Sequence, residues 1–260
     1  MIQREDAAGL IVISQLAHAW VSGQLARAWG NQRFGEFAPR EEICQAAEQH
    51  DLGFLKWEQA PTLNWQNGLP HTFMDLPTRR HLEIWSAGVQ DMLLFGRYPA
   101  LLVSLHFTAM CERHRLVDQP EEARLKRDFL VEQTAFQSAL LTSLRNDPYY
   151  APFSGDDLLA RHRQLMAAWD RLSLLLCIGL DSERVVEEVP SRAGLAALTL
   201  TPADDRSGRI IVAPWPFRSE PVRLVCEGKR LPRHFKAEGE MREALRTAPT
   251  VTLQIELLPS

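Results

Sequence analysis

Five histidine and aspartate side chains stand where the surrounding pattern calls for buried apolar residues: His18, the adjacent pair His50 and Asp51, His106 and Asp170. An unpaired imidazole or carboxylate on the buried face of a helix costs several kcal/mol. A shared divalent metal ion would remove that cost, because imidazole nitrogen and carboxylate oxygen are both metal ligands. These residue types therefore predict a metal centre.

Helical spacing places each of these residues on or beside the apolar side of an expected helix. His50 stands seven residues after Ile43 and four after Ala46, in a helix that Pro39 opens. His106 has Leu102 four residues before it on the same face. The helices that carry the other ligands are expected at residues 14–29 with Ser14 as N-cap, 99–115 and 156–178. The ligands thus come from separate helices, which must converge on one point.

After about Asp181 the pattern changes from helical periodicity to the alternation of half-buried strands. Residues 251–257 alternate apolar and polar side chains, and strand-like runs occur near 195–201, 210–212 and 222–226, with a short helix at 238–247. The sequence therefore predicts a mainly α protein. It has a helical metal-binding domain over residues 1–181 and a small β-rich (α+β) appendage over 182–260.

Residues 53–77 read as a long loop rich in Pro, Asn, Gly and Trp. Loops of this length often cover functional sites, so this segment is predicted to be a lid. Its Trp57 and Trp65, together with the β-rich tail, are also candidates for an interaction surface. The tail strands either pack on the helices or pair across a homodimer.

Composition excludes several classes of function. A net charge of -4 and a pI near 6.1 give no reason to expect nucleic acid as a partner. The first residues lack the order of a secretion signal, and the apolar run at 172–180 is too short to span a bilayer. The cysteines are widely separated and form no CxxC pair, as expected of reduced thiols: Cys44, Cys111, Cys177 and Cys226. We expect a cytoplasmic protein without a membrane partner.

The order of the candidate ligands resembles that of the HD-domain superfamily, in which a His, a later His-Asp pair and a late Asp lie in a helical bundle. The matching segments are Gln15-Leu16-Ala17-His18-Ala19, Gln49-His50-Asp51-Leu52-Gly53 and Trp169-Asp170-Arg171-Leu172-Ser173. The resemblance covers about residues 10 to 180 and leaves the tail unexplained. The whole chain looks similar to an uncharacterised bacterial branch of that superfamily.

The resemblance implies that His18, His50, Asp51 and Asp170 bind a divalent metal. The ion would be Mn, Fe, Zn, Ni or Mg, and there would be one ion or two. Superfamily members with two metals add histidines between the pair and the final Asp. The candidates here are His106 first and His81 second. His114, His162 and His234 adjoin basic residues and are expected at the surface.

The superfamily mostly hydrolyses phosphoesters, so the leading expectation is a metal-dependent phosphohydrolase acting on a phosphorylated small molecule. Asp51 and His106 are the expected catalytic residues. Lys56 and Arg97, with Arg79 and Arg80 beside His81, are candidates for binding the substrate phosphate. The chain lacks the Gly-Tyr-Pro signature of the cyclic-dinucleotide phosphodiesterases, so that substrate is not expected.

Two alternatives remain open. A minor branch of the superfamily uses six ligands to hold two irons for oxygenation of a C–H bond, and His81 would complete that set here. The other alternative is a non-catalytic HD-like protein that holds a metal structurally or senses a ligand.

Overall fold

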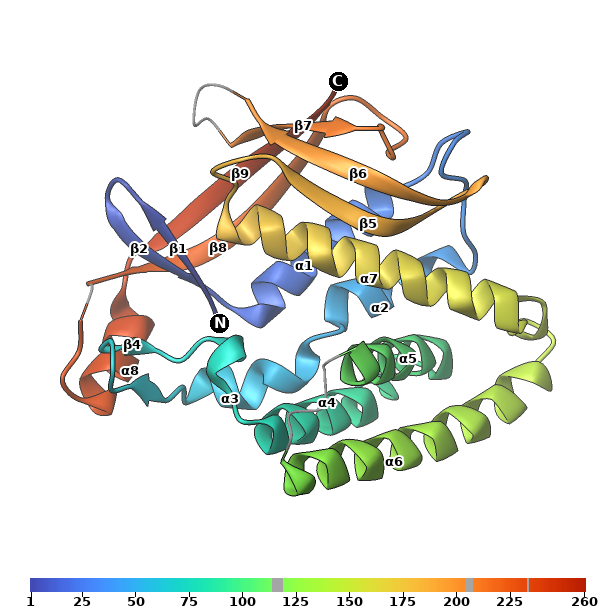
Figure 1. Ribbon diagram of the computed structural model, residues 1–260, viewed down its shortest axis with the longest axis horizontal. Coiled ribbons are helices and arrows are strands. Elements are labelled where there is room, and N and C mark those ends of the chain that lie inside the picture. Colours follow the sequence, from blue (N-terminus) through green and yellow to red (C-terminus); the bar gives the residue numbers. More distant parts are fainter. Residues whose placement is uncertain (114–118, 204–207, 233) are drawn as a thin grey trace.

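The computed structural model describes residues 1–113, 119–203, 208–232 and 234–260, and it combines a helical body with a curled, half-barrel sheet (Figure 1). The helices are α1 (Gln15–Ala28), α2 (Arg40–Gln49), α3 (Leu55–Gln59), α4 (Thr78–Met92), α5 (Arg97–Arg113), α6 (Pro120–Arg145), α7 (Asp156–Ile178) and α8 (Glu238–Thr247). Short 3-10 turns are η1 (Leu52–Phe54), η2 (Phe73–Asp75) and η3 (Ala151–Phe153). Within the described residues, no helix is long and apolar enough to cross a membrane.

The large sheet is mixed and has seven strands in the order β1-β2-β8-β9-β7-β6-β5. Its strands are β1 (Ile2–Asp6), β2 (Gly9–Ile13), β5 (Arg184–Ser191), β6 (Gly194–Pro202), β7 (Arg209–Ala213), β8 (Val222–Leu231) and β9 (Thr250–Pro259). Only the pair β7 and β9 is parallel among these strands. A separate two-stranded hairpin consists of β3 (Leu63–Asn64) and β4 (Leu69–Pro70).

The expectation of a mainly α protein with a small β-rich appendage is wrong: the chain is a substantial α+β fold. The N-terminal hairpin β1–β2 joins the sheet by pairing with β8, with Leu10 opposite Leu231. The sheet therefore draws strands from both ends of the chain. Neither strand of the hairpin carries a clear period of two, because β1 is mostly polar and β2 is a continuous apolar run.

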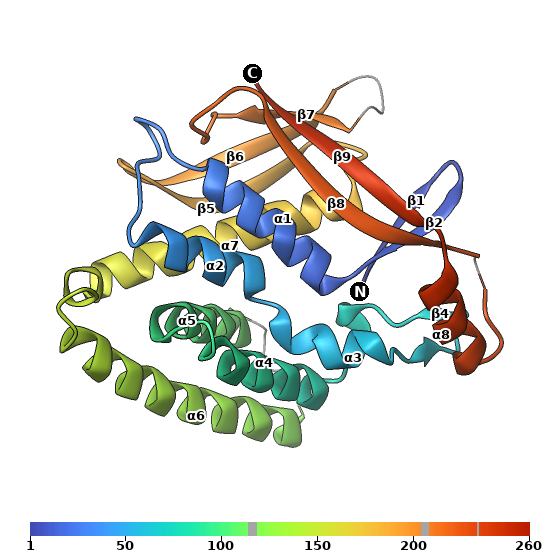
Figure 2. The ribbon, with the colours of Figure 1, turned by 180° about the vertical axis from the view of Figure 1, so that it is seen from behind.

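The sheet positions two of the helices that carry candidate ligands. Its concave side holds α1, which packs against β8, and α7, which packs against β5 (Figures 1 and 2). On the side away from the sheet, α2 packs against α1 and α7, α5 packs against α2 and α7, and α4 and α6 cover α5 in turn. The expected N-cap of α1 is confirmed, since Ser14 Oγ accepts a hydrogen bond from the Ala17 amide at 3.0 Å.

His162, expected at the surface, is buried inside the fold with 1% of its area exposed. Its Nδ1 lies 2.9 Å from the hydroxyl of Tyr98, which donates its own proton to the Phe153 carbonyl, so Nδ1–H is the donor to Tyr98. Burial, with a smaller effect of Arg161, lowers the pKa of His162 to about 4. His234 is exposed as expected, whereas His114 lies outside the described residues.

The buried His162 predicts a loss of stability in mild acid. Its pKa is near 6.5 in the unfolded chain and about 4 in the folded one, so between those values only the unfolded chain takes up the proton. The free energy of unfolding should therefore fall by about 3 kcal/mol as the pH drops from 6.5 to 4. Urea unfolding across that range should show the fall in the parent and a shallower slope in His162→Gln. His234→Gln is the control and should keep the parent's slope; parallel curves for parent and His162→Gln would contradict the assignment.

Candidate metal centre

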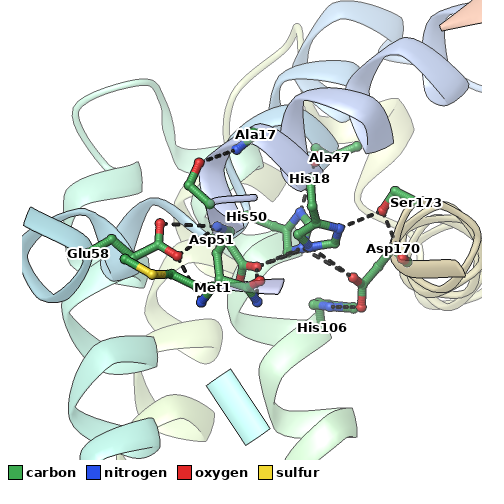
Figure 3. Close-up of polar contacts among 12 residues, drawn as sticks. Met1, Ala17, His18, Ala47, His50, Asp51, Glu58, His106, Asp170 and Ser173 are labelled. Atoms are coloured by element: carbon green, nitrogen blue, oxygen red, sulfur yellow. Dashed lines mark hydrogen bonds and ion pairs between the residues drawn. The ribbon is translucent and has the colours of Figure 1, made fainter. Parts of the chain in front are cut away.

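The predicted ligands come together in the structure from four separate parts of the helical body (Figure 3). His18 extends from α1, His50 is the C-cap of α2 with Asp51 directly after it, His106 is on α5 and Asp170 on α7. All but Asp170 are less than a tenth exposed, and the Asp170 side chain is 13% exposed. The sequence prediction that these helices converge is confirmed.

The donor atoms of His18, His50, Asp51 and Asp170 are spaced like ligands around one ion. His18 Nε2 lies 3.2 Å from Asp51 Oδ2 and 3.4 Å from Asp170 Oδ1. His50 Nε2 lies 3.6 Å and 3.4 Å from the same two oxygens. Ligands about 2.1 Å from a metal ion are about 3.0 to 3.4 Å from their neighbours in octahedral or tetrahedral arrangements. The observed spacings fit a metal centre of this size.

His106 extends the set on the side of Asp170. Its Nε2 lies 3.3 Å from Asp170 Oδ2 but is buried without a well-oriented hydrogen bond to any described atom. Two overlapping groups of three donors result, each with all its atoms within 4.8 Å of one another, and His50 belongs to both: His18, His50 and Asp51; His50, His106 and Asp170. A buried nitrogen without an oriented partner is the arrangement that a metal ion would satisfy.

Hydrogen bonds behind the site set the orientation of two imidazole rings. Ser173 Oγ donates to the Asp170 carbonyl, so at 2.8 Å from His18 Nδ1 it accepts a hydrogen bond from that nitrogen. His50 Nδ1–H likewise donates to the Ala47 carbonyl at 2.9 Å. In each ring Nδ1 is thus occupied by its hydrogen bond, and Nε2, which faces the carboxylates, is the nitrogen that a metal ion would bind. Metal-binding histidines are held in this way.

Charge in the site is balanced between imidazoles and carboxylates. Burial by itself lowers the pKa of His50, but the carboxylates of Asp51 and Asp170 outweigh it and raise that pKa to about 9. Burial raises the pKa of Asp170, but the adjacent imidazoles of His106 and His50 hold it well below its usual value. At neutral pH the site without metal therefore pairs an ionised Asp170 with a protonated His50, and a divalent ion that binds there would take the place of that proton.

A cavity of about 280 Å³ adjoins the five ligands. Its other lining residues are Gln15, Phe54, Phe73, Met74, Thr78, His81, Leu82, Trp85, Met110, Cys111, Lys126 and Leu174. Phe73 and Met74 come from the segment that was expected to be a lid. A hydrogen bond from the Leu63 amide to the Glu238 carboxylate connects this segment to the C-terminal region. The cavity thus places the metal ligands beside space for a small molecule.

The other predicted site residues lie elsewhere. His81 lines the cavity with its ring near Phe54 and Trp85, but it belongs to neither group of candidate ligands found among the described residues. Lys56 is exposed on α3 and does not line the cavity. Arg97 also lies outside the cavity lining, where it pairs with Asp147.

Two polar residues of the cavity wall were missed by the sequence analysis. Gln15 precedes His18 by one helical turn, and its Nε2 donates to Asp51 Oδ2 at 3.2 Å. Lys126 is buried on α6, three residues before the buried Phe129 and seven before the buried Gln133. That helical spacing was the available signal for Lys126. The same three-residue spacing, from Gln15 to the candidate ligand His18, was the available signal for Gln15.

The fold and the site together define an α+β protein whose helices bring a buried histidine and aspartate cluster beneath a curled sheet. The chain belongs to the family described as "Protein of unknown function (DUF3891)", whose model matches residues 1–233, from β1 through β8. No curated protein and no solved structure matches it.

Proposed function

We propose that this protein is a metal-dependent hydrolase of the HD type, acting on a phosphorylated small molecule. The observation that carries the proposal is the pair of hydrogen bonds that orient two imidazoles, from His18 Nδ1 to the Ser173 hydroxyl and from His50 Nδ1 to the Ala47 carbonyl. Each directs Nε2 at the carboxylates of Asp51 and Asp170, at 3.2 to 3.6 Å. A mixed set of imidazole and carboxylate donors suits Mn, Fe, Zn or Ni. Mg fits it less well, because Mg prefers oxygen donors.

A bound divalent ion would lower the pKa of a water molecule towards neutrality and offset negative charge on phosphoryl oxygens. His18, His50, Asp51 and Asp170 would hold it. His106 Nε2 either completes this set or donates a hydrogen bond to a phosphoryl oxygen of the substrate. The substrate phosphate would be bound by Lys126, which lines the cavity, in place of Lys56 and Arg97, which do not.

The test begins with metal content. The protein is purified without a metal-binding tag, its metals are measured by elemental analysis, and a panel of phosphomonoesters is assayed with each candidate ion. We expect one or two ions per chain and metal-dependent release of phosphate, both absent from His50→Ala. No bound metal after reconstitution would contradict the metal centre. Metal without turnover of any phosphoester would contradict the hydrolase and support a structural or sensory role.

The competing di-iron oxygenase is favoured by one observation, the presence of His81 in the cavity wall beside the other five ligands. Its ring centroid lies 5.3 Å from that of Trp85 and 6.0 Å from that of Phe54, within an aromatic wall. Because its nitrogens fall outside the two ligand groups, His81→Ala should retain the parent's metal content. Elemental analysis of that variant checks this prediction.

His106→Ala is the comparison for His81→Ala. It removes a nitrogen 3.3 Å from Asp170 Oδ2, so it should weaken metal binding, whereas His81→Ala should not. Loss of one of two bound irons from His81→Ala would instead support the six-ligand oxygenase.

A further inference from the structure

The cavity wall beyond the candidate ligands is mainly apolar and aromatic. Phe54, Phe73, Leu82, Trp85, Met110 and Leu174 form most of it. The residues come from η1, η2, α4, α5 and α7, so the apolar surface surrounds the space on several sides. If a molecule binds at the histidine and aspartate cluster, the part of it that extends into the cavity must contact this apolar surface.

The aromatic part of the wall is rigid. Trp85 stacks on Phe107 with ring centroids 5.0 Å apart and an angle of 10° between the planes, and Phe129 packs against it at 6.1 Å. The His81 ring lies next to it, with its centroid 5.3 Å from that of Trp85. Because Trp85 is held by its neighbours before any molecule binds, little conformational entropy is lost when a ring packs on this wall.

Hydroxyl groups would be poorly accommodated against these residues. A hydroxyl that leaves water for an apolar wall loses its hydrogen bonds without replacement. Between the wall and the metal ligands, the described polar side chains are few: Gln15, Thr78, His81 and Lys126. A bound molecule with many hydroxyl groups would need more hydrogen-bond partners than these four side chains can supply.

The charge of the cavity lining also limits how many phosphoryl groups a bound molecule can carry. Lys126 is the one Lys or Arg among the described residues that line the cavity. One lysine and one metal centre that already holds two carboxylates match a single phosphoryl group better than a chain of phosphates. The volume, about 280 Å³, is at the low end for small-molecule sites, which begin at about 300 Å³.

We propose that the cavity binds the phosphate monoester of a small, apolar, ring-bearing alcohol, with the ring against the wall formed by Trp85 and Met110. This inference rests on the proposed phosphohydrolase function and adds the substrate class. It excludes polyhydroxylated phosphates, such as sugar phosphates, and nucleoside polyphosphates as preferred ligands.

The test measures binding without turnover. Isothermal titration of the metal-loaded protein uses three probes: inorganic phosphate, phenylphosphonate and 2,3-dihydroxypropylphosphonate. We expect phenylphosphonate to bind about tenfold more tightly than the dihydroxypropyl compound, since burying a ring is worth at least that factor. Met110→Gln, which places an amide in the wall at similar size, should reduce the preference to less than about threefold. Leu94→Gln, at an exposed position outside the cavity lining, should behave as the parent.

The outcomes separate this inference from the function on which it rests. If phosphate and both phosphonates fail to bind the metal-loaded parent, the phosphohydrolase proposal fails. If phosphate binds but the dihydroxypropyl compound binds as well as phenylphosphonate, the substrate class alone is overturned. The comparison of probes on the parent gives this answer even if Met110→Gln does not fold, and Met74→Gln, at a largely exposed position of the same wall, then replaces it.

Discussion

Replacing Asp170 by Asn is expected to abolish the metal binding that we propose for this protein. Among the described residues, Asp170 is the one whose oxygens approach three imidazoles, with Oδ1 3.4 Å from His18 Nε2 and His50 Nε2 and Oδ2 3.3 Å from His106 Nε2. The amide keeps the shape of the carboxylate but loses its charge, and it can turn its NH₂ towards the ligand set. Because even residues that only orient ligands change metal affinity by about 10- to 100-fold, loss of a ligand should weaken binding by more than about 100-fold.

Elemental analysis after dialysis checks this, with competition against a chelator of known affinity to obtain the ratio. Asp157→Asn is the matched control, since Asp157 is an exposed residue in the first turn of the same helix, α7. It should retain the parent's metal. Equal metal content in Asp170→Asn and the parent would show that α7 contributes no ligand.

The ligands of this site were predictable because each breaks the pattern of its own helix. His18, His50, His106 and Asp170 lie at apolar spacings on helices whose positions are confirmed, and burial of such side chains demands a common explanation. Local periodicity sufficed for this. That the ligands bind a metal stays a prediction.

The predicted sheet was too small, because the number of strands in the sheet depends on pairing between segments that are distant in the sequence. The tail strands alternate and were expected, but β2 is a short apolar run that periodicity cannot distinguish from the start of a helix. Its place is set by β8, more than 200 residues away, through pairs such as Val12 with Lys229. His162 was misplaced because its basic neighbours suggested a surface position, although it stands three residues from both Leu159 and Leu165 on the buried face of α7; its partner Tyr98, on α5, is distant in sequence.

Replacing Gly53 by Ala is expected to damage both the fold and metal binding, because the backbone of α4 leaves no room for a side chain at this position. A Cβ atom at Gly53 would lie 2.1 Å from the Ile84 carbonyl oxygen and 2.9 Å from the Gly88 amide nitrogen. These are backbone atoms of α4, so no side chain can move aside to relieve the overlap. The turn η1 would have to separate from α4, and Asp51, which immediately precedes η1, would move with it. We expect a loss of about 3 kcal/mol or more in the free energy of unfolding, at the upper end for overpacking.

Urea unfolding and metal analysis of Gly53→Ala test this, with two further glycines as references. Gly88→Ala meets the same contact from the other side, at 2.9 Å from the Gly53 nitrogen, and should destabilise the protein less because its overlap is smaller. Gly239→Ala, in α8 with no atom within 4 Å of the added Cβ, should be neutral or stabilise by up to about 1 kcal/mol. A Gly53→Ala protein as stable as Gly239→Ala would contradict the close approach of η1 and α4. If Gly53→Ala instead folds with reduced stability but the parent's metal content, Asp51 keeps its position without this contact, and the glycine serves packing alone.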